Sequence, residues 1–244
     1  MPVRMKAFLL HLVGSAFVAL LILILVFQFW YPAPLHEAVG VTRIFLLLLL
    51  VDVILGPLLT LLAFKVGKKT LVFDLSVILL LQVSALGYGL WTVAEGRPAW
   101  LVFNVDRFDL VRTLDIDERQ LSETREEYRM APWFGPEWVG AAKPVDIAQQ
   151  NAILFESLMA RIDIAQRPNL YRPLSDMGDD LRQKLRPLES LANYNDEQQL
   201  RTILNRWPNA DAWLPLMASA KPMTVLLRKD TAEVIAIVEL NPWD

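Results

Sequence analysis

Residues 46–62 read Leu-Leu-Leu-Leu-Leu-Val-Asp-Val-Ile-Leu-Gly-Pro-Leu-Leu-Thr-Leu-Leu. The run is apolar enough to lie in lipid, yet Asp52 stands near its centre. A carboxylate at the centre of a bilayer costs about 2.5–3.5 kcal/mol on insertion scales, so such a residue is a candidate functional site. Gly56 lies one helical turn further on, on the same face as Asp52, and Pro57 follows it. This stretch predicts a transmembrane helix that contains a polar site.

Two further apolar runs flank this stretch. The sequence predicts three transmembrane helices over about residues 7–30, 43–64 and 73–94, each long enough for a bilayer core of about 30 Å. The first run has a basic start, as a signal peptide does. It is longer than the 7–15 apolar residues typical of a signal peptide, and it ends in Phe-Trp-Tyr-Pro-Ala-Pro, so we interpret it as a retained span. Trp30 and Tyr31 are expected at the headgroup level.

The distribution of Lys and Arg predicts the orientation of these helices. Most of the flanking basic residues lie before the first run or between the second and third runs: Arg4, Lys6, Lys65, Lys68 and Lys69. These two segments are on the same side of the membrane by parity, and the opposite side has only Arg43 and Arg97. We therefore expect a cytoplasmic N-terminus, a bacterial inner-membrane location and a periplasmic second half.

Three polar residues fall near the bilayer midplane when helical rise is applied: Asp52, Gln82 and Ser84. They are candidates for one hydrogen-bonded cluster between helices, with Gly56 and Pro57 beside it. In one interpretation Asp52 is a buried, neutral acid that holds the three helices together. In the other it meets a polar group on another protein's helix. The sequence leaves both interpretations open.

Composition divides the chain into two domains. Of 244 residues, 54% are hydrophobic, and these crowd into residues 1–95, the predicted three-helix transmembrane domain. That part has 6 Lys and Arg and 4 Asp and Glu, whereas residues 96–244, the predicted periplasmic domain, have 18 and 23. Without a basic patch, nucleic acid is not an expected partner. The lipid bilayer is an expected partner.

The sequence offers little for catalysis. Cysteine is absent, and His11 and His36 are the only histidines, both in the predicted membrane domain. The second half therefore lacks the side chains for a Ser-His-Asp triad or a His-ligated zinc site. We expect no metal, no cofactor and no enzymatic activity.

The second half has the pattern of an α+β domain. Strands are expected over residues 99–105 and 108–114, and a hairpin over 223–240. Between them the pattern predicts a charged, solvated helix over 117–128 and an amphipathic helix over 146–161. The apolar side of the amphipathic helix is expected to carry Ile147, Ile153, Leu154, Leu158 and Ile162.

Two shorter segments of this half are candidate sites. Asp106 and Arg107 are expected to form an exposed salt bridge at a turn. Residues 132–142 contain Trp133, Phe134 and Trp138 among Pro and Gly, which predicts an irregular aromatic loop. Its aromatic side chains either form a protein interaction surface or fold inward over the core, and the sequence does not decide between these alternatives.

Several short motifs occur in a fixed order along the chain. They are Lys6-Ala-Phe8 with His11, Trp30-Tyr-Pro-Ala-Pro-Leu35, Val51-Asp-Val-Ile-Leu-Gly-Pro-Leu-Leu-Thr60, Gly67-Lys-Lys-Thr-Leu-Val-Phe-Asp74, Tyr88-Gly-Leu-Trp-Thr-Val93, Val102-Phe-Asn-Val-Asp-Arg-Phe108 and Asn151-Ala-Ile-Leu-Phe155. With these motifs the chain resembles the type IV pilin accessory proteins of the TfpX/TfpZ family over essentially its full length.

The resemblance implies an inner-membrane accessory factor for type IV pilus biogenesis that promotes the assembly or surface display of the pilin. It implies the major pilin as partner, with the pilin's transmembrane helix in contact with the bundle near Asp52 and its head in contact with the periplasmic domain. Pilin helices resemble one another in carrying a charged group within an apolar run. The alternatives are a membrane-anchored periplasmic ligand-binding or sensor protein and a membrane-tethered periplasmic enzyme.

Overall fold

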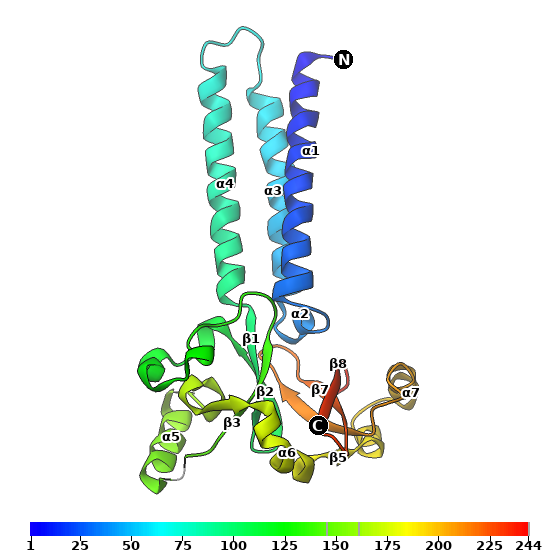
Figure 1. The fold of residues 1–244 in the computed structure, drawn as a ribbon. Coiled ribbons are helices and arrows are strands. Elements are labelled where there is room, and N and C mark those ends of the chain that lie inside the picture. Colours follow the sequence, from blue (N-terminus) through cyan, green and yellow to red (C-terminus); the bar gives the residue numbers. More distant parts are fainter. Residues whose placement is uncertain (145, 161, 244) are drawn as a thin grey trace.

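The computed structural model describes residues 1–144, 146–160 and 162–243. An elongated helical stem stands on a domain of strands and short helices (Figure 1). Among the described residues, three helices are long and apolar enough to cross a membrane. They are α1 (Val3–Ile24) with its π-helical extension (Leu25–Trp30), α3 (Val41–Ala63) and α4 (Leu71–Glu95). The predicted fold class, three transmembrane helices followed by an α+β domain, is confirmed.

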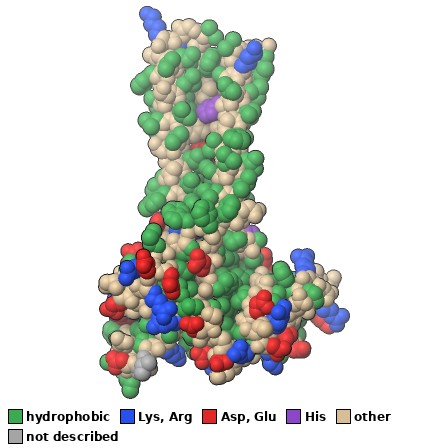
Figure 2. All heavy atoms as spheres, viewed as in Figure 1, with side chains coloured by type: hydrophobic (Ala, Val, Ile, Leu, Met, Phe, Trp, Pro, Cys, Tyr) green, Lys and Arg blue, Asp and Glu red, His purple; other side chains and the backbone are tan. Residues whose placement is uncertain are grey.

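The surface of the molecule changes character between stem and domain. Hydrophobic side chains cover most of the visible face of the stem, whereas charged side chains gather on the domain (Figure 2). Helices suit the stem because each satisfies its backbone hydrogen bonds internally, which lipid requires. The N-terminus and the connection between α3 and α4 lie at the end of the stem away from the domain (Figure 1). The stem is therefore the membrane anchor.

Trp30 and Tyr31, which were expected at the headgroup level, face the interior of the protein and not the lipid. Both are buried, at 6% and 1% exposure, in the cluster where the stem meets the domain. The Tyr31 hydroxyl donates to the Val93 carbonyl at 2.6 Å and so ties the end of the first span to α4. A buried tyrosine normally needs such a partner for its hydroxyl.

A short helix, α2 (Leu35–Ala38), follows the first span and joins the stem to the domain core. Leu35 and Ala38 are buried in the same hydrophobic cluster as the central strands. The Ala38 carbonyl accepts backbone hydrogen bonds from Ala220 at 3.0 Å and Lys221 at 3.1 Å. Residues 35–38 belong to the stretch that the sequence assigned to the membrane domain, but they pack with the other domain.

The domain is built on one curled mixed sheet. In its described part the strands run in the order β4-β3-β1-β2-β6-β7-β8, with β5 paired to β6. The strands are β1 (Pro98–Asn104), β2 (Arg107–Arg112), β3 (Glu137–Ala141), β4 (Tyr171–Pro173), β5 (Arg186–Pro187), β6 (Ala212–Met217), β7 (Met223–Arg228) and β8 (Glu233–Val238). The pairs β1–β3 and β2–β6 are parallel and the others are antiparallel. The predicted hairpin is confirmed as β7 and β8.

Strand β1 is buried along its whole length because both faces of the sheet are covered. Leu101 and Phe103 point into one hydrophobic cluster, and Trp100 and Val102 point into another. This alternation is the two-residue period of a strand. A strand with two covered faces is apolar at every position, as in residues 98–103.

Two predicted segments differ from the structure. Residues 117–128 form 3₁₀ helices (Glu118–Glu123 and Glu126–Tyr128) in place of one solvated helix, and the Tyr128 ring is buried against Trp100. Residues 132–142 are not irregular throughout, because β3 begins at Glu137 and pairs with β1. Tertiary packing overrides the local pattern in both segments.

The remaining short 3₁₀ helices are Thr113–Asp115, Ile164–Gln166, Pro168–Leu170, Leu174–Met177 and Leu188–Asn193.

Helix α5 (Ile147–Ala160) is present, but the predicted apolar side is not buried. Ile153 packs against a hydrophobic cluster, whereas Ile147, Leu154 and Leu158 are exposed. Ile162 follows the helix. Glu156 holds α5 to the domain through ion pairs with Arg119 and Arg167.

The remaining helices, α6 (Gly178–Lys184) and α7 (Glu197–Leu204), are short.

We predict that Leu35→Ala destabilises the domain, because it removes buried methyl groups where α2 enters the core. Such changes cost about 2–5 kcal/mol in free energy of unfolding. The measurement is urea unfolding of the full chain in detergent, followed by tryptophan fluorescence. Leu114→Ala is the control: Leu114 is exposed, and its loss is expected to cost less than about 0.5 kcal/mol. Equal costs for the two variants would contradict the docking of α2.

We also predict a pH-dependent contribution from Asp117. Arg119 donates to both carboxylate oxygens, at 2.8 and 2.7 Å, and lowers the pKa of Asp117 below its usual value. A lowered pKa stabilises the fold above the unfolded-state pKa of about 4, and this stabilisation disappears as pH falls through the folded-state pKa. Asp117→Asn should therefore lower stability at pH 7 by about 1–3 kcal/mol.

The difference in free energy of unfolding between wild type and Asp117→Asn should shrink as the pH falls through the folded-state pKa of Asp117, because the wild-type carboxylate then also becomes protonated. Urea unfolding at a series of pH values measures this. The control is Glu197→Gln, which breaks an exposed pair with Arg201 and is expected to change little at any pH. A difference that stays constant down to the lowest pH would contradict the prediction.

Candidate functional site

Gln82 on α4 is the centre of a polar cluster inside the stem. Its amide nitrogen donates to the Asp52 backbone carbonyl at 3.0 Å and to the Ser15 hydroxyl at 3.2 Å. Its amide oxygen lies 3.0 Å from Nε2 of His11. One side chain thus bonds to α1 and α3 from α4. Hydrogen bonds of this kind are an important attraction between helices in lipid, where the helices gain nothing from excluding water.

His11 brings a further residue, Thr60, into the cluster. Its Nδ1 lies 2.6 Å from the Thr60 hydroxyl oxygen. Because an amide oxygen only accepts, His11 Nε2 donates to Gln82. In a neutral imidazole Nδ1 then accepts the Thr60 proton. Every polar atom of the imidazole therefore has a partner within the bundle.

Gly56 and Pro57 are buried where α3 faces Gln82. A Cβ atom at Gly56 would lie 2.0 Å from the Gln82 amide oxygen, so only glycine leaves space for this amide. Pro57 lacks an amide hydrogen and cannot donate to the carbonyl of Val53, which α3 tolerates within the bundle. The absence of a side chain at Gly56 therefore makes room for the polar cluster.

A cavity of about 260 Å³ opens beside the cluster. Its lining comes from all three spans: His11, Gly14, Ser15 and Val18 of α1, Asp52 of α3, and Leu79, Gln82, Val83 and Leu86 of α4. Helices α1 and α4 both pack on α3, so the cavity lies where α1 and α4 separate. It is mostly apolar with a few polar groups, as a binding site for a side chain would be.

The structure brings together three of the five intramembrane residues singled out from the sequence. Asp52, Gly56 and Gln82 lie at the cluster, Pro57 is buried next to Gly56 on α3, and Ser84 is exposed on α4 and takes no part. Gln82 donates to the backbone carbonyl of Asp52, and Asp52 also lines the cavity. Among the described residues, no ion pair involves the Asp52 carboxylate.

The residues singled out from the sequence did not include His11 and Thr60. The available signal was that each is a polar residue within an apolar run, the same signal that identified Asp52. Periodicity could not show that His11 and Thr60, 49 residues apart, face each other.

The three aromatic residues of the candidate surface on the α+β domain separate in the structure. Trp138 packs inward, edge-on to Phe108 with 5.0 Å between ring centroids. Trp133 and Phe134 are exposed and lie beside Trp30 and Phe29, at the end of the first span. The inward-folding alternative therefore holds for Trp138, whereas Trp133 and Phe134 remain exposed.

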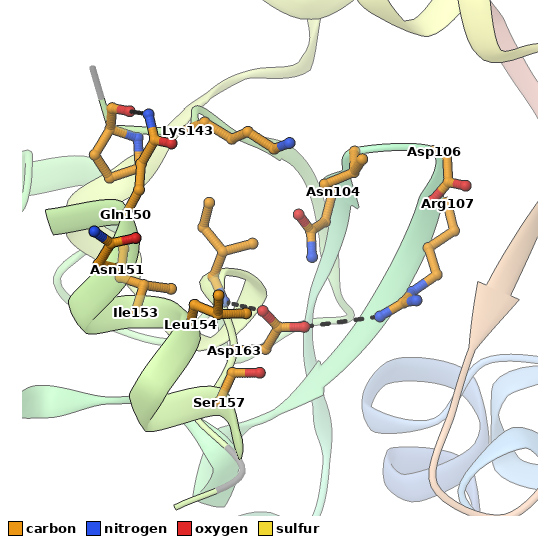
Figure 3. A pocket seen from close by; sticks show the side chains of 13 residues that line it. Asn104, Asp106, Arg107, Lys143, Gln150, Asn151, Ile153, Leu154, Ser157 and Asp163 are labelled. Carbon is orange, nitrogen blue, oxygen red and sulfur yellow. Dashed lines mark hydrogen bonds and ion pairs between the residues drawn. The ribbon is translucent and has the colours of Figure 1, made fainter. Parts of the chain in front are cut away.

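A pocket of about 480 Å³ lies between the β1–β2 turn and α5. Asn104, Lys143 and Asp163 point into this space (Figure 3). The predicted pair of Asp106 with Arg107 is not formed, because Arg107 pairs with Asp109 at 3.0 Å and lies 3.8 Å from Asp163.

Arg107, which lines this pocket, is paired with Asp109. Burial raises the pKa of the Asp109 carboxyl, and Arg107 opposes that rise. Val105, a β-branched residue, has a φ of 63° at the turn, a conformation that costs about 1–3 kcal/mol and occurs often at functional sites. Within the described residues no group of three or more His, Cys, Asp or Glu is arranged to hold a metal ion.

Comparison with known proteins covers both parts of the chain. Residues 1–40 match the family model described as fimbrial assembly protein FimB. The chain is 29% identical over 243 residues to the serogroup I fimbrial assembly protein of Dichelobacter nodosus, covering 96% of this chain and 94% of that protein, and it matches the serogroup E1 protein equally.

A shorter relative has a higher identity, over a shorter alignment. The fimbrial assembly protein of serogroups C1 and C2 of Dichelobacter nodosus is 35% identical over 109 residues, which cover 44% of this chain and 83% of that protein. No solved structure matches. The chain therefore belongs to the fimbrial assembly protein family.

Proposed function

We propose that this protein is an inner-membrane accessory factor for type IV pilus biogenesis that binds the major pilin and promotes its assembly or surface display. The names of its relatives support the role in fimbrial assembly. The motifs it shares with the TfpX/TfpZ group support the narrower assignment to type IV pilins.

The proposed topology has the N-terminus in the cytoplasm and the α+β domain in the periplasm. The N-terminus and the connection carrying Lys65, Lys68 and Lys69 lie at one end of the stem (Figure 1). Basic residues favour the cytoplasmic side. Lys68 pairs with Asp74 at 2.6 Å, and the other basic residues at that end leave an excess of positive charge there.

The observation that carries the proposal is the cavity between α1 and α4 with Asp52 at its wall. Gly14 and Ser15 are small and leave space on the α1 side of the cavity, where a Cβ at Gly14 would meet nothing within 4 Å. A pilin helix lying along α1 and α4 would place one of its side chains in the cavity. A charged or hydrogen-bonding group there would find the Asp52 carboxylate, which is a partner that lipid does not offer.

We propose no catalytic step. The periplasmic domain would act by contact with the pilin head, and the exposed apolar residues of α5 offer one such surface.

A second candidate function, a periplasmic ligand-binding protein, is favoured by the pocket between the β1–β2 turn and α5. Its mixture of amide, cationic and anionic side chains suits a small polar ligand. The stem cavity and the family of the chain favour the pilin factor.

We predict that a photo-crosslinking residue at position 18 captures the pilin in cells. Val18 lines the cavity, whereas the adjacent Phe17 is exposed on α1 without lining it. Position 17 is therefore the matched control and is expected to give less adduct. Equal adducts at both positions, or none, would contradict a pilin site at the cavity.

We further predict that Asp52→Asn and Asp52→Ala reduce pilus number while the level of the protein itself stays unchanged. Electron microscopy counts the pili and immunoblotting measures the protein. If both variants lose protein together with pili, Asp52 stabilises the bundle and does not contact pilin. If neither variant changes pilus number, the role proposed for Asp52 fails.

A third variant separates the cluster from the carboxylate. Gly56→Ala should displace the Gln82 amide and weaken its bonds to α1, while Asp52 remains. The expected result is a lower thermal unfolding temperature in detergent, and Ser84→Ala, at an exposed α4 position, is the control that should leave it unchanged. No difference between the two would show that the cluster does not hold the helices.

A further inference from the structure

The segment between Met130 and Pro136 lies against the end of the first span. The Phe134 ring packs edge-on to Phe29 with 5.8 Å between centroids, and Trp133 lies 6.2 Å from Trp30. Gly135 has a φ of +80°, and a Cβ there would meet the Phe29 carbonyl at 3.4 Å. We call residues 130–136 the aromatic loop. It follows the backbone of the first span closely at the point where that span ends.

Arg97 fixes the aromatic loop to the end of the third span as well. Its guanidinium donates to the Ala94 carbonyl at 2.7 Å and to the Pro132 carbonyl at 3.3 Å. The same group lies over the Trp133 ring, 4.5 Å from its centroid. Contacts with both spans hold the aromatic loop at the level where the stem meets the domain.

The side chains of the loop are nevertheless open to the surroundings. Met130, Trp133 and Phe134 are 75%, 55% and 76% exposed. Large apolar side chains exposed together normally mark a contact with another phase or partner. Packing inside this chain therefore accounts for the position of the loop but not for its exposed side chains.

The stem indicates what covers them. Tyr88 and Trp91 are exposed on α4, and Trp91 lies four residues, about 6 Å, before the end of that helix. Phe29 is exposed at the matching end of the first span. Aromatic residues at this height of a transmembrane helix sit among lipid headgroups. The aromatic loop continues this belt, at the level where Trp30 and Tyr31 turn inward.

We propose that the aromatic loop inserts into the headgroup region of the bilayer and anchors the α+β domain against the membrane surface. The partner is the phospholipid bilayer itself, and Trp133 and Phe134 are the inserted side chains. This contact limits tilting of the domain relative to the stem. It is independent of the proposed pilin contacts, which lie at the stem cavity and on α5.

The test uses the full chain in phosphatidylcholine–phosphatidylglycerol liposomes. Because the chain has no cysteine, Phe134→Cys or Met130→Cys gives a single site for a nitroxide spin label. Power-saturation EPR compares collisions of the label with oxygen, which dissolves in lipid, and with a water-soluble nickel chelate. At positions 130 and 134 oxygen collisions are expected to exceed nickel collisions.

Phe155→Cys is the matched control, because Phe155 is 64% exposed on α5, away from the stem. Its label is expected to collide more with nickel than with oxygen. Circular dichroism checks that each variant keeps its helical content. If the labels at both 130 and 134 behave like the label at 155, the loop lies in water and the proposal is overturned.

Discussion

The hydrogen bonds of Gln82 are the contacts on which the stem depends. In lipid, apolar helices gain little from contact with one another, so packing and a few polar bonds must hold them. Gln82 supplies bonds to two other helices at once. Gly56 supports this arrangement by leaving space for the amide, and His11 supports it by donating to the amide oxygen. Asp52, whose backbone carbonyl accepts from Gln82, also lines the cavity, which links the stability of the bundle to its proposed partner site.

A second set of contacts makes stem and domain one structure. The helix α2 lies within the domain core, the Tyr31 hydroxyl bonds to α4, and Arg97 connects α4 to the aromatic loop. A short loop between two spans would ordinarily lie in water. Here it is buried because its apolar residues, Leu35 and Ala38, complete the cluster formed by β1, β2, β6 and β7. A change in the helix bundle can therefore reach the α+β domain through packed side chains rather than through a flexible linker.

Local patterns predicted the elements that depend on local properties. The spans followed from apolar length, and the β7–β8 hairpin followed from two β-rich runs around a polar turn. Patterns failed where distant segments decide the outcome. Residues 117–128 have helical charge spacing, yet Tyr128 packs on Trp100 and the segment is 3₁₀. Strand β6 was not among the predicted elements, and it contains Pro215, a residue type that argues against a strand inside a sheet.

The sequence by itself determined that this chain is a three-span membrane protein with an α+β domain, and that Asp52 and Gln82 are polar groups at similar depth. Apolar length and helical rise suffice for this, since both are properties of single segments. Only the tertiary structure decided which polar atoms meet, that His11 and Thr60 join the cluster while Ser84 does not, and that Trp133 and Phe134 lie at the end of the first span. Those outcomes depend on the rotation of each helix about its axis and on the path of the chain between domains. Both are set by packing between residues far apart in sequence.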